Sequence, residues 1–308
     1  MYQEISQLLM YGDLEEDSIL AQMGELFGKY ETGEYNKTGL VRDINTQVKR
    51  ILKVATDYGF DDNLWHNYLT FFLMMSENPF SMTCEKVGAS DGSVNALVEN
   101  DFRIFKELFD YDFGPIEKDL GINCFSQISN YKAIHKKDLM YNKNVSEKVR
   151  SLSKKLEAAK DEKEFFDAVT GFYKDYGVGM FGLNKAFRID DTPQGSFTFR
   201  AINNMDTVML DDLVGYEIQK KKLVDNTEAF VQGKKANNVL LFGDSGTGKS
   251  TSIKAIVNQY YKDGLRMIEI YKHQFKYLSE IIAEIKNRNY RFIIYMDDLS
   301  FEEFEIEY

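Results

Sequence analysis

Apolar residues recur at helical spacing through most of the first 176 residues of the chain. The pattern is clear in four segments, at residues 40–58, 63–75, 94–109 and 145–159. An apolar residue at every third or fourth position gives a helix one buried face. Asp161 lies three residues before Glu164, a spacing that predicts a capped N-terminus for a further helix. We therefore expect residues 1–176 to form a mostly α-helical N-terminal domain.

The pattern changes after residue 176. Residues 177–205 are rich in glycine and turn residues, with a short strand-like alternation at 196–201, and we expect a linker or domain junction there. Further on, strands are predicted at 238–242, 265–270 and 291–296, and helices at 217–231, 250–262 and 274–287. Strands that alternate with helices predict a three-layer α/β domain with a parallel sheet. We place this domain at residues 206–308.

Residues 243–250 read Gly-Asp-Ser-Gly-Thr-Gly-Lys-Ser, the G-x-x-x-x-G-K-S (Walker A) pattern of a phosphate-binding loop. The apolar run before it and the helical pattern after it are the strand and helix that this P-loop requires. Backbone N–H groups of such a loop and the positive end of the following helix bind phosphate oxygens. Lys249 would contact the β- and γ-phosphates, and the Ser250 hydroxyl would bind Mg²⁺. The expected nucleotide-binding residues are Gly243, Asp244, Ser245, Gly246, Thr247, Gly248, Lys249, Ser250 and Thr251.

A second apolar run, at 292–296, ends in Asp297 and Asp298. In P-loop enzymes the first acid after such a Walker B strand holds Mg²⁺, and a second acid can orient the attacking water. We expect Asp297 to be a metal ligand beside Ser250, and Asp298 to be the candidate catalytic acid beside Lys249. The choice of water-orienting acid stays open, because aspartate reaches less far than glutamate and two glutamates follow, Glu302 and Glu303.

Several of these segments together resemble the AAA+-type ATP-binding proteins of the bacterial domain of unknown function 815. The resemblance is carried by Val214-Gly-Tyr-Glu217, by 237–250, by 264–270 and by 292–303, and it is strong over 205–308. It implies an AAA+-like fold, and ATP as the nucleotide, because the AAA+ segment matching Val214, Gly215 and Tyr216 lines the adenine site. It also implies an arginine finger from a neighbouring subunit.

The end of the chain departs from the AAA+ pattern. AAA+ proteins continue past the Mg²⁺ acids with a sensor strand, which lies between the phosphate-loop strand and the acid-bearing strand of the sheet. Two explanations are open. We favour a truncated sequence with an incomplete sheet; alternatively, 238–242 and 291–296 pair directly, as in the kinase–GTPase branch of P-loop proteins. On either explanation we expect the 308-residue chain to have little ATPase activity by itself.

Composition narrows the range of expected binding partners and cellular compartments. A net charge of −11 disfavours general electrostatic binding to nucleic acid, and we interpret the lysines at 220–222, 234 and 235 as a solvated surface. The two cysteines and three histidines have no metal-ligand spacing. The sequence begins without a signal-peptide pattern and has no apolar stretch long enough to span a bilayer. We expect a cytoplasmic protein.

The leading hypothesis is an AAA+-type ATPase that couples Mg²⁺-ATP binding and hydrolysis to a conformational change or to oligomerisation. Its helical N-terminal domain would recognise a protein partner. A non-hydrolysing ATP-dependent switch or scaffold is the alternative, and mutation of Asp298 would separate the two. A small P-loop kinase is a third interpretation, although no arginine-rich lid follows Asp298.

Overall fold

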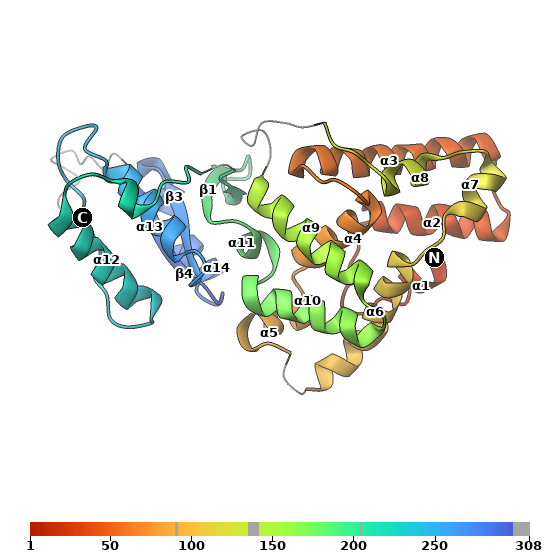
Figure 1. The fold of residues 1–308 in the computed structure, drawn as a ribbon, viewed down its shortest axis with the longest axis horizontal. Helices are drawn as coiled ribbons and strands as arrows, with labels where there is room; N and C mark the ends of the chain where they lie inside the picture. Colours follow the sequence, from red (N-terminus) through yellow and green to blue (C-terminus); the bar gives the residue numbers. More distant parts are fainter. Residues whose placement is uncertain (90–91, 135–141, 204, 298–308) are drawn as a thin grey trace. The chain divides into compact units, whose positions relative to one another are not determined.

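The computed structural model of the chain describes residues 1–89, 92–134, 142–203 and 205–297 (Figure 1). The chain divides into two compact units, Met1–Leu183 and Asn184–Tyr308. Each unit has its own hydrophobic core. Among the described residues, no helix combines the length and the apolar character that crossing a membrane requires.

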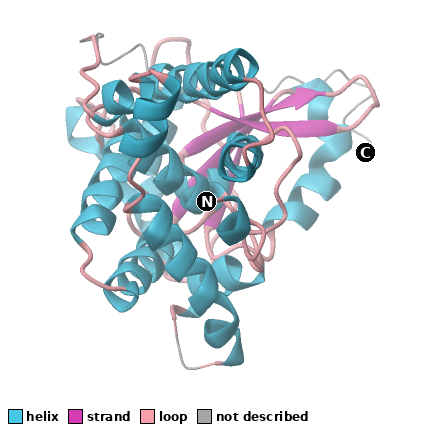
Figure 2. Cartoon of the chain, turned by 90° about the vertical axis from the view of Figure 1, so that its right-hand side faces the viewer, coloured by secondary structure: helices cyan, strands magenta, loops and turns pink. Residues whose placement is uncertain are grey.

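The described part of the N-terminal unit is built from helices, cyan in Figure 2. They are α1 (Tyr2–Ile5), α2 (Ile19–Thr32), α3 (Lys37–Tyr58), α4 (Leu64–Met75), α5 (Pro79–Val87), α6 (Ser93–Phe109), α7 (Gly114–Leu120), α8 (Cys124–Ser129), α9 (Lys143–Ala158), α10 (Glu162–Tyr176) and α11 (Gly179–Leu183). The predicted helices in this region are confirmed to within a few residues. Asp161 caps α10 by accepting the backbone N–H of Glu164 at 2.8 Å, as its spacing predicted.

Helix α4 lies in the core of this unit, which explains its nearly continuous apolar sequence. Its residues from Leu64 to Thr70 are all buried. Trp65 satisfies its indole N–H by donating to the carbonyl of Leu108 at 2.9 Å. The segment at residues 9–11 is held by the buried Asp101 carboxylate, which accepts hydrogen bonds from the backbone N–H groups of these residues.

The C-terminal unit contains a four-stranded sheet, magenta in Figure 2. Its strands are β1 (Ala186–Asp191), β2 (Phe197–Ala201), β3 (Leu265–Ile270) and β4 (Arg291–Met296), in the order β2-β1-β3-β4. β1 pairs parallel with β3, and β3 pairs parallel with β4. β2 pairs antiparallel with β1 through a turn that ends at Gly195, whose φ of 79° favours glycine. The sheet is therefore mixed, not wholly parallel as predicted.

The expected junction at residues 177–205 includes the boundary between the two units, after Leu183. It contains helix α11 and the two paired strands β1 and β2, so it is not a loose linker. Strand β1 lies inside the sheet, between β2 and β3. The sequence did not predict β1, because the alternating pattern at 196–201 indicated only its hairpin partner β2.

Helices pack on both faces of the sheet. They are η2 (Leu210–Asp212), α12 (Glu217–Val231), α13 (Lys249–Tyr260), η3 (Lys272–Tyr277) and α14 (Leu278–Ile285), with η denoting 3₁₀ helices. On one face, Ile253 and Ile256 of α13 join a core with Leu265 and Met267 of β3. On the other face, η3 is fixed by the Tyr277 hydroxyl, which donates to Asp191 at 2.8 Å. The α13 face is the one that carries the candidate site.

The strand predicted at 238–242 is wrong. These residues have no strand conformation, and Leu240 and Phe242 are 72% and 88% exposed. Among the described strands, β4 pairs with β3 alone, so the alternative in which 238–242 pairs directly with 291–296 is also wrong. An apolar run becomes a sheet strand only when a neighbouring strand accepts and donates its backbone hydrogen bonds. The run at 238–242 has no such neighbour among the described residues.

Candidate nucleotide-binding site

The loop at 243–248 leads directly into helix α13. Its three glycines, Gly243, Gly246 and Gly248, have φ between 77° and 141°, which other residues rarely adopt. Gly248 is also the N-cap of α13 and has no side chain to accept the first N–H groups of the helix. These N–H groups and the helix dipole therefore point toward a site suited to an anion.

Lys249 folds back over this loop. Its Nζ donates to the carbonyls of Gly243 at 2.9 Å and Asp244 at 2.7 Å. The Thr247 hydroxyl also donates to the carbonyl of Asp244, at 2.8 Å, and closes the loop on itself. The lysine charge is therefore held at the loop where bound phosphates would need it.

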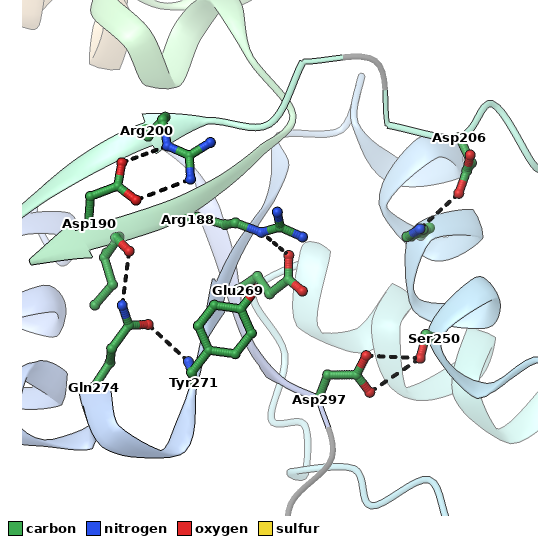
Figure 3. Close-up of polar contacts among 11 residues, drawn as sticks. Arg188, Asp190, Arg200, Asp206, Ser250, Glu269, Tyr271, Gln274 and Asp297 are labelled. Carbon is green, nitrogen blue, oxygen red and sulfur yellow. Dashed lines mark hydrogen bonds and ion pairs between the residues drawn. The ribbon is translucent and has the colours of Figure 1, made fainter. Parts of the chain in front are cut away.

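Ser250 and Asp297 meet across the start of α13 and the end of β4, as Figure 3 shows. The Ser250 hydroxyl donates to the two Asp297 carboxylate oxygens at 3.3 and 3.4 Å. Both residues supply oxygen atoms, the donors that Mg²⁺ prefers. No group of three or more His, Cys, Asp or Glu that could hold a metal ion occurs within the described ranges. One hydroxyl and one carboxylate fit Mg²⁺ bound together with nucleotide phosphates and water, rather than an ion held by protein ligands alone.

Two further polar side chains lie on the same face of the sheet. The Arg188 Nε of β1 donates to the Glu269 Oε2 of β3 at 2.8 Å, and the Glu269 side chain is only 12% exposed (Figure 3). The hydrogen bond that Arg188 donates to Glu269 is the main cause that raises the pKa of Arg188 above its ordinary value. Sequence reasoning missed this pair. The only signal was a glutamate inside strand β3, whose residues are apolar except for Glu269 and Arg266.

Tyr295 of β4 was missed as well, because it reads as part of an apolar run. It lies directly opposite Glu269 in the sheet. Its pKa is raised to about 12, first by burial and then by the Asp297 carboxylate, while Ser250 acts in the opposite direction. The phenol therefore lies near the Ser250–Asp297 pair.

The expected adenine-site residues precede α12. Val214 and Tyr216 are 95% and 58% exposed, and Tyr216 and Gly215 both have positive φ. Helix α12 is tied to the segment before the phosphate loop, because the Asn226 side chain exchanges two hydrogen bonds of 2.9 Å with the backbone of Asn237. The adenine role of Val214, Gly215 and Tyr216 stays a prediction. The candidate acids Asp298, Glu302 and Glu303 lie outside the described residues.

This architecture is compatible with an α/β NTPase fold: a mostly parallel sheet, a glycine-rich loop and a helix that begins beside the end of a strand. The family model described as "Protein of unknown function (DUF815)" matches residues 183–308, a range that corresponds to the C-terminal unit.

A distant similarity points to the AAA+ type. A stretch of 74 residues is 34% identical to the replication factor C large subunit of Methanococcus vannielii. That stretch covers 24% of this chain and 15% of the archaeal protein, so the chain spans only a small part of its relative. No solved structure matches the chain. The family match and this similarity together support a DUF815 protein of AAA+ type.

Proposed function

We propose that the C-terminal unit binds ATP together with Mg²⁺, and that the chain couples this binding to a conformational change or to oligomerisation with a protein partner. The observation that carries the proposal is the convergence of Lys249, Ser250 and Asp297 where α13 begins and β4 ends. Three kinds of phosphate-binding group meet there: helix N–H groups, a lysine charge and oxygen donors for a metal.

Each residue has a distinct proposed role. The N–H groups of 243–251 would bind phosphate oxygens, and Lys249 would leave its loop carbonyls to contact the β- and γ-phosphates. Ser250 and Asp297 would hold Mg²⁺, which when bound neutralises phosphate charge. The segment Val214–Tyr216 would cover the adenine. Asp298 is the proposed acid for orienting water if the protein hydrolyses ATP.

Removing the lysine charge tests the proposal. We expect Lys249→Ala to weaken Mg²⁺-ATP binding by about tenfold or more, because a charge-assisted contact to phosphate is lost. Lys254→Ala is the matched control, since Lys254 lies further along α13 and pairs with Asp206 at 2.8 Å. Isothermal titration calorimetry of both variants with ATP and MgCl₂ measures the difference. Equal affinities in the wild type and Lys249→Ala would contradict the proposed site.

A further inference from the structure

Positively charged side chains gather at the edge of the C-terminal unit where β3 and β4 begin. Three segments form this edge: 232–235 after α12, 261–264 after α13, and 286–291 after α14. We call these residues the basic edge. Because β3 and β4 run parallel, their first residues share one edge of the sheet, whereas Asp297 follows the other end of β4. The basic edge is therefore separate from the proposed nucleotide site.

Direct contacts join the three segments of the basic edge. Arg291, the first residue of β4, donates its backbone N–H to the carbonyl of Gly264 at 3.0 Å. Its side chain reaches the segment after α12, because a Cβ atom added at Gly233 would lie 2.9 Å from Arg291 Nη2. The cations that follow each of these contacts in the chain therefore lie on one continuous surface.

Arg266 holds two of the segments from the inside. Its guanidinium carbon lies 4.2 Å from the centroid of the Tyr261 ring and 4.4 Å from that of Tyr290. Its Nη1 donates to the carbonyls of Tyr261 at 3.1 Å and Leu265 at 3.0 Å. Arg266 is only 3% exposed, and cation–π contacts and charged donors are strong when they are shielded from water. The backbone of the basic edge is therefore held in place by a buried arginine.

The exposed side chains of the basic edge are polar and mostly positive. Its exposed cations are Lys234, Lys235, Lys262, Lys286 and Arg291. None of these cations forms an ion pair with another residue in the part of the chain that the structure describes. Asp263 is the only acid within the three segments, and cations outnumber acids even when the flanking Glu228 and Glu284 are included. The surface is therefore suited to a ligand with several negative charges.

The composition of the basic edge favours phosphate groups over an acidic protein segment. Lys, Arg, Asn and Tyr are side chains that contact nucleic-acid phosphates, and Asn287 and Asn289 add exposed amides to this surface. Protein–protein interfaces usually depend on anchor side chains in desolvated pockets. No large apolar side chain is exposed within the three segments. The net charge of −11 does not oppose binding here, because charges more than about 8 Å apart are largely screened at physiological ionic strength.

We propose that the basic edge binds nucleic acid through the phosphate backbone, without reading the base sequence. The inference goes beyond the proposed nucleotide function, because it assigns a second ligand to the opposite edge of the same sheet. It also gives a role to Lys234 and Lys235, which the sequence alone indicates only as a solvated surface.

Fluorescence anisotropy of the full chain with labelled duplex DNA and with labelled single-stranded RNA tests the proposal, and the tighter ligand identifies the kind of nucleic acid. We expect binding that weakens steeply as salt is added. Lys262→Glu combined with Lys286→Glu should lower the affinity by about tenfold or more. For duplex DNA it should also reduce the slope of log K against log salt by about two, one for each lost phosphate contact.

Lys221→Glu combined with Lys222→Glu is the matched control. It makes the same change in net charge on two exposed lysines of α12, about 15 Å before the end of that helix. The affinity of this variant should change by less than about twofold, because the substituted charges lie beyond the screening distance.

Three results would overturn the proposal. They are equal losses in the two double variants, a wild-type chain that binds neither nucleic acid at low salt, and tighter binding of polyglutamate than of either nucleic acid. The last result would assign the basic edge to an acidic protein partner. Thermal unfolding checks that the variants are folded. If Lys262→Glu with Lys286→Glu is unfolded, Lys234→Glu with Lys235→Glu gives the same comparison from the segment after α12.

Discussion

His66 illustrates how a single buried side chain sets a pH limit on the N-terminal unit. It lies in α4 with 8% exposure, and its Nε2 donates to the carbonyl of Phe109 at 2.8 Å. The neutral ring therefore carries its proton on Nε2, and its Nδ1 has no hydrogen-bond partner and lies 3.8 Å from the Glu157 carboxylate. Burial lowers the pKa of His66 below its usual range, and the carbonyl of Phe109 and the Glu157 carboxylate offset the effect only in part.

We expect acid to destabilise this unit through His66. Because the folded pKa is lower than the unfolded one, the unfolded chain binds more protons as the pH falls below about 6.5. The contribution of His66 to the free energy of unfolding is complete above that pH and decreases as the pH falls toward the lowered folded pKa. The slope of this decrease is at most about 1.4 kcal/mol per pH unit. Urea unfolding followed by Trp65 fluorescence at several pH values measures it. His66→Gln should flatten the profile, whereas His273→Gln, in the other unit, should not; identical profiles in all three proteins would refute the assignment.

At the scale of elements, two ion pairs on β1 differ in burial and therefore in their contribution to stability. Arg188 pairs with Glu269, whose side chain is 12% exposed, whereas Arg200 of β2 pairs with the half-exposed Asp190 (Figure 3). Solvent screens an exposed pair, so its loss changes little. Loss of Arg188 instead leaves a mostly buried carboxylate without its partner.

We therefore expect Arg188→Met to lower the free energy of unfolding of the C-terminal unit by about 1–2 kcal/mol. Arg200→Met is the comparison and should have no measurable effect. Urea unfolding followed by far-UV circular dichroism measures both variants. Equal losses in the two variants would mean that burial of Glu269 does not decide the stability of this sheet.

The same elements indicate where sequence reasoning succeeds. Helix α12 and strands β3 and β4 have the predicted bounds, and the phosphate loop precedes α13, because these features depend on residues close together in the chain. The run at 238–242 failed because a strand needs a partner that no local pattern specifies. Similarly, β1 and the Arg188–Glu269 pair depend on contacts between segments distant in sequence. Tyr295 lay inside a correctly predicted strand, but its neighbours Glu269 and Ser250 became visible only in three dimensions.

At the scale of the whole molecule, each unit closes its own hydrophobic core, and the candidate site belongs to one of them. The N-terminal core contains Trp65, the single tryptophan of the chain, and the C-terminal core contains α13 and β3. Two separate cores predict two unfolding transitions. Trp65 fluorescence reports the N-terminal transition alone, while calorimetry reports both.

Nucleotide binding should stabilise the unfolding transition of the C-terminal unit only. A ligand that binds the folded state stabilises it by about 2.7 kcal/mol at a hundred times its Kd. We expect Mg²⁺-ATP to raise the midpoint temperature of the calorimetric transition of the C-terminal unit. The midpoint of the transition followed by Trp65 fluorescence should stay unchanged. Lys249→Ala, which lacks the phosphate-binding charge, should remove the shift. If the Trp65 transition rises with ATP as well, the two units unfold together and nucleotide binding is coupled to the N-terminal unit, as a partner-binding domain controlled by ATP requires.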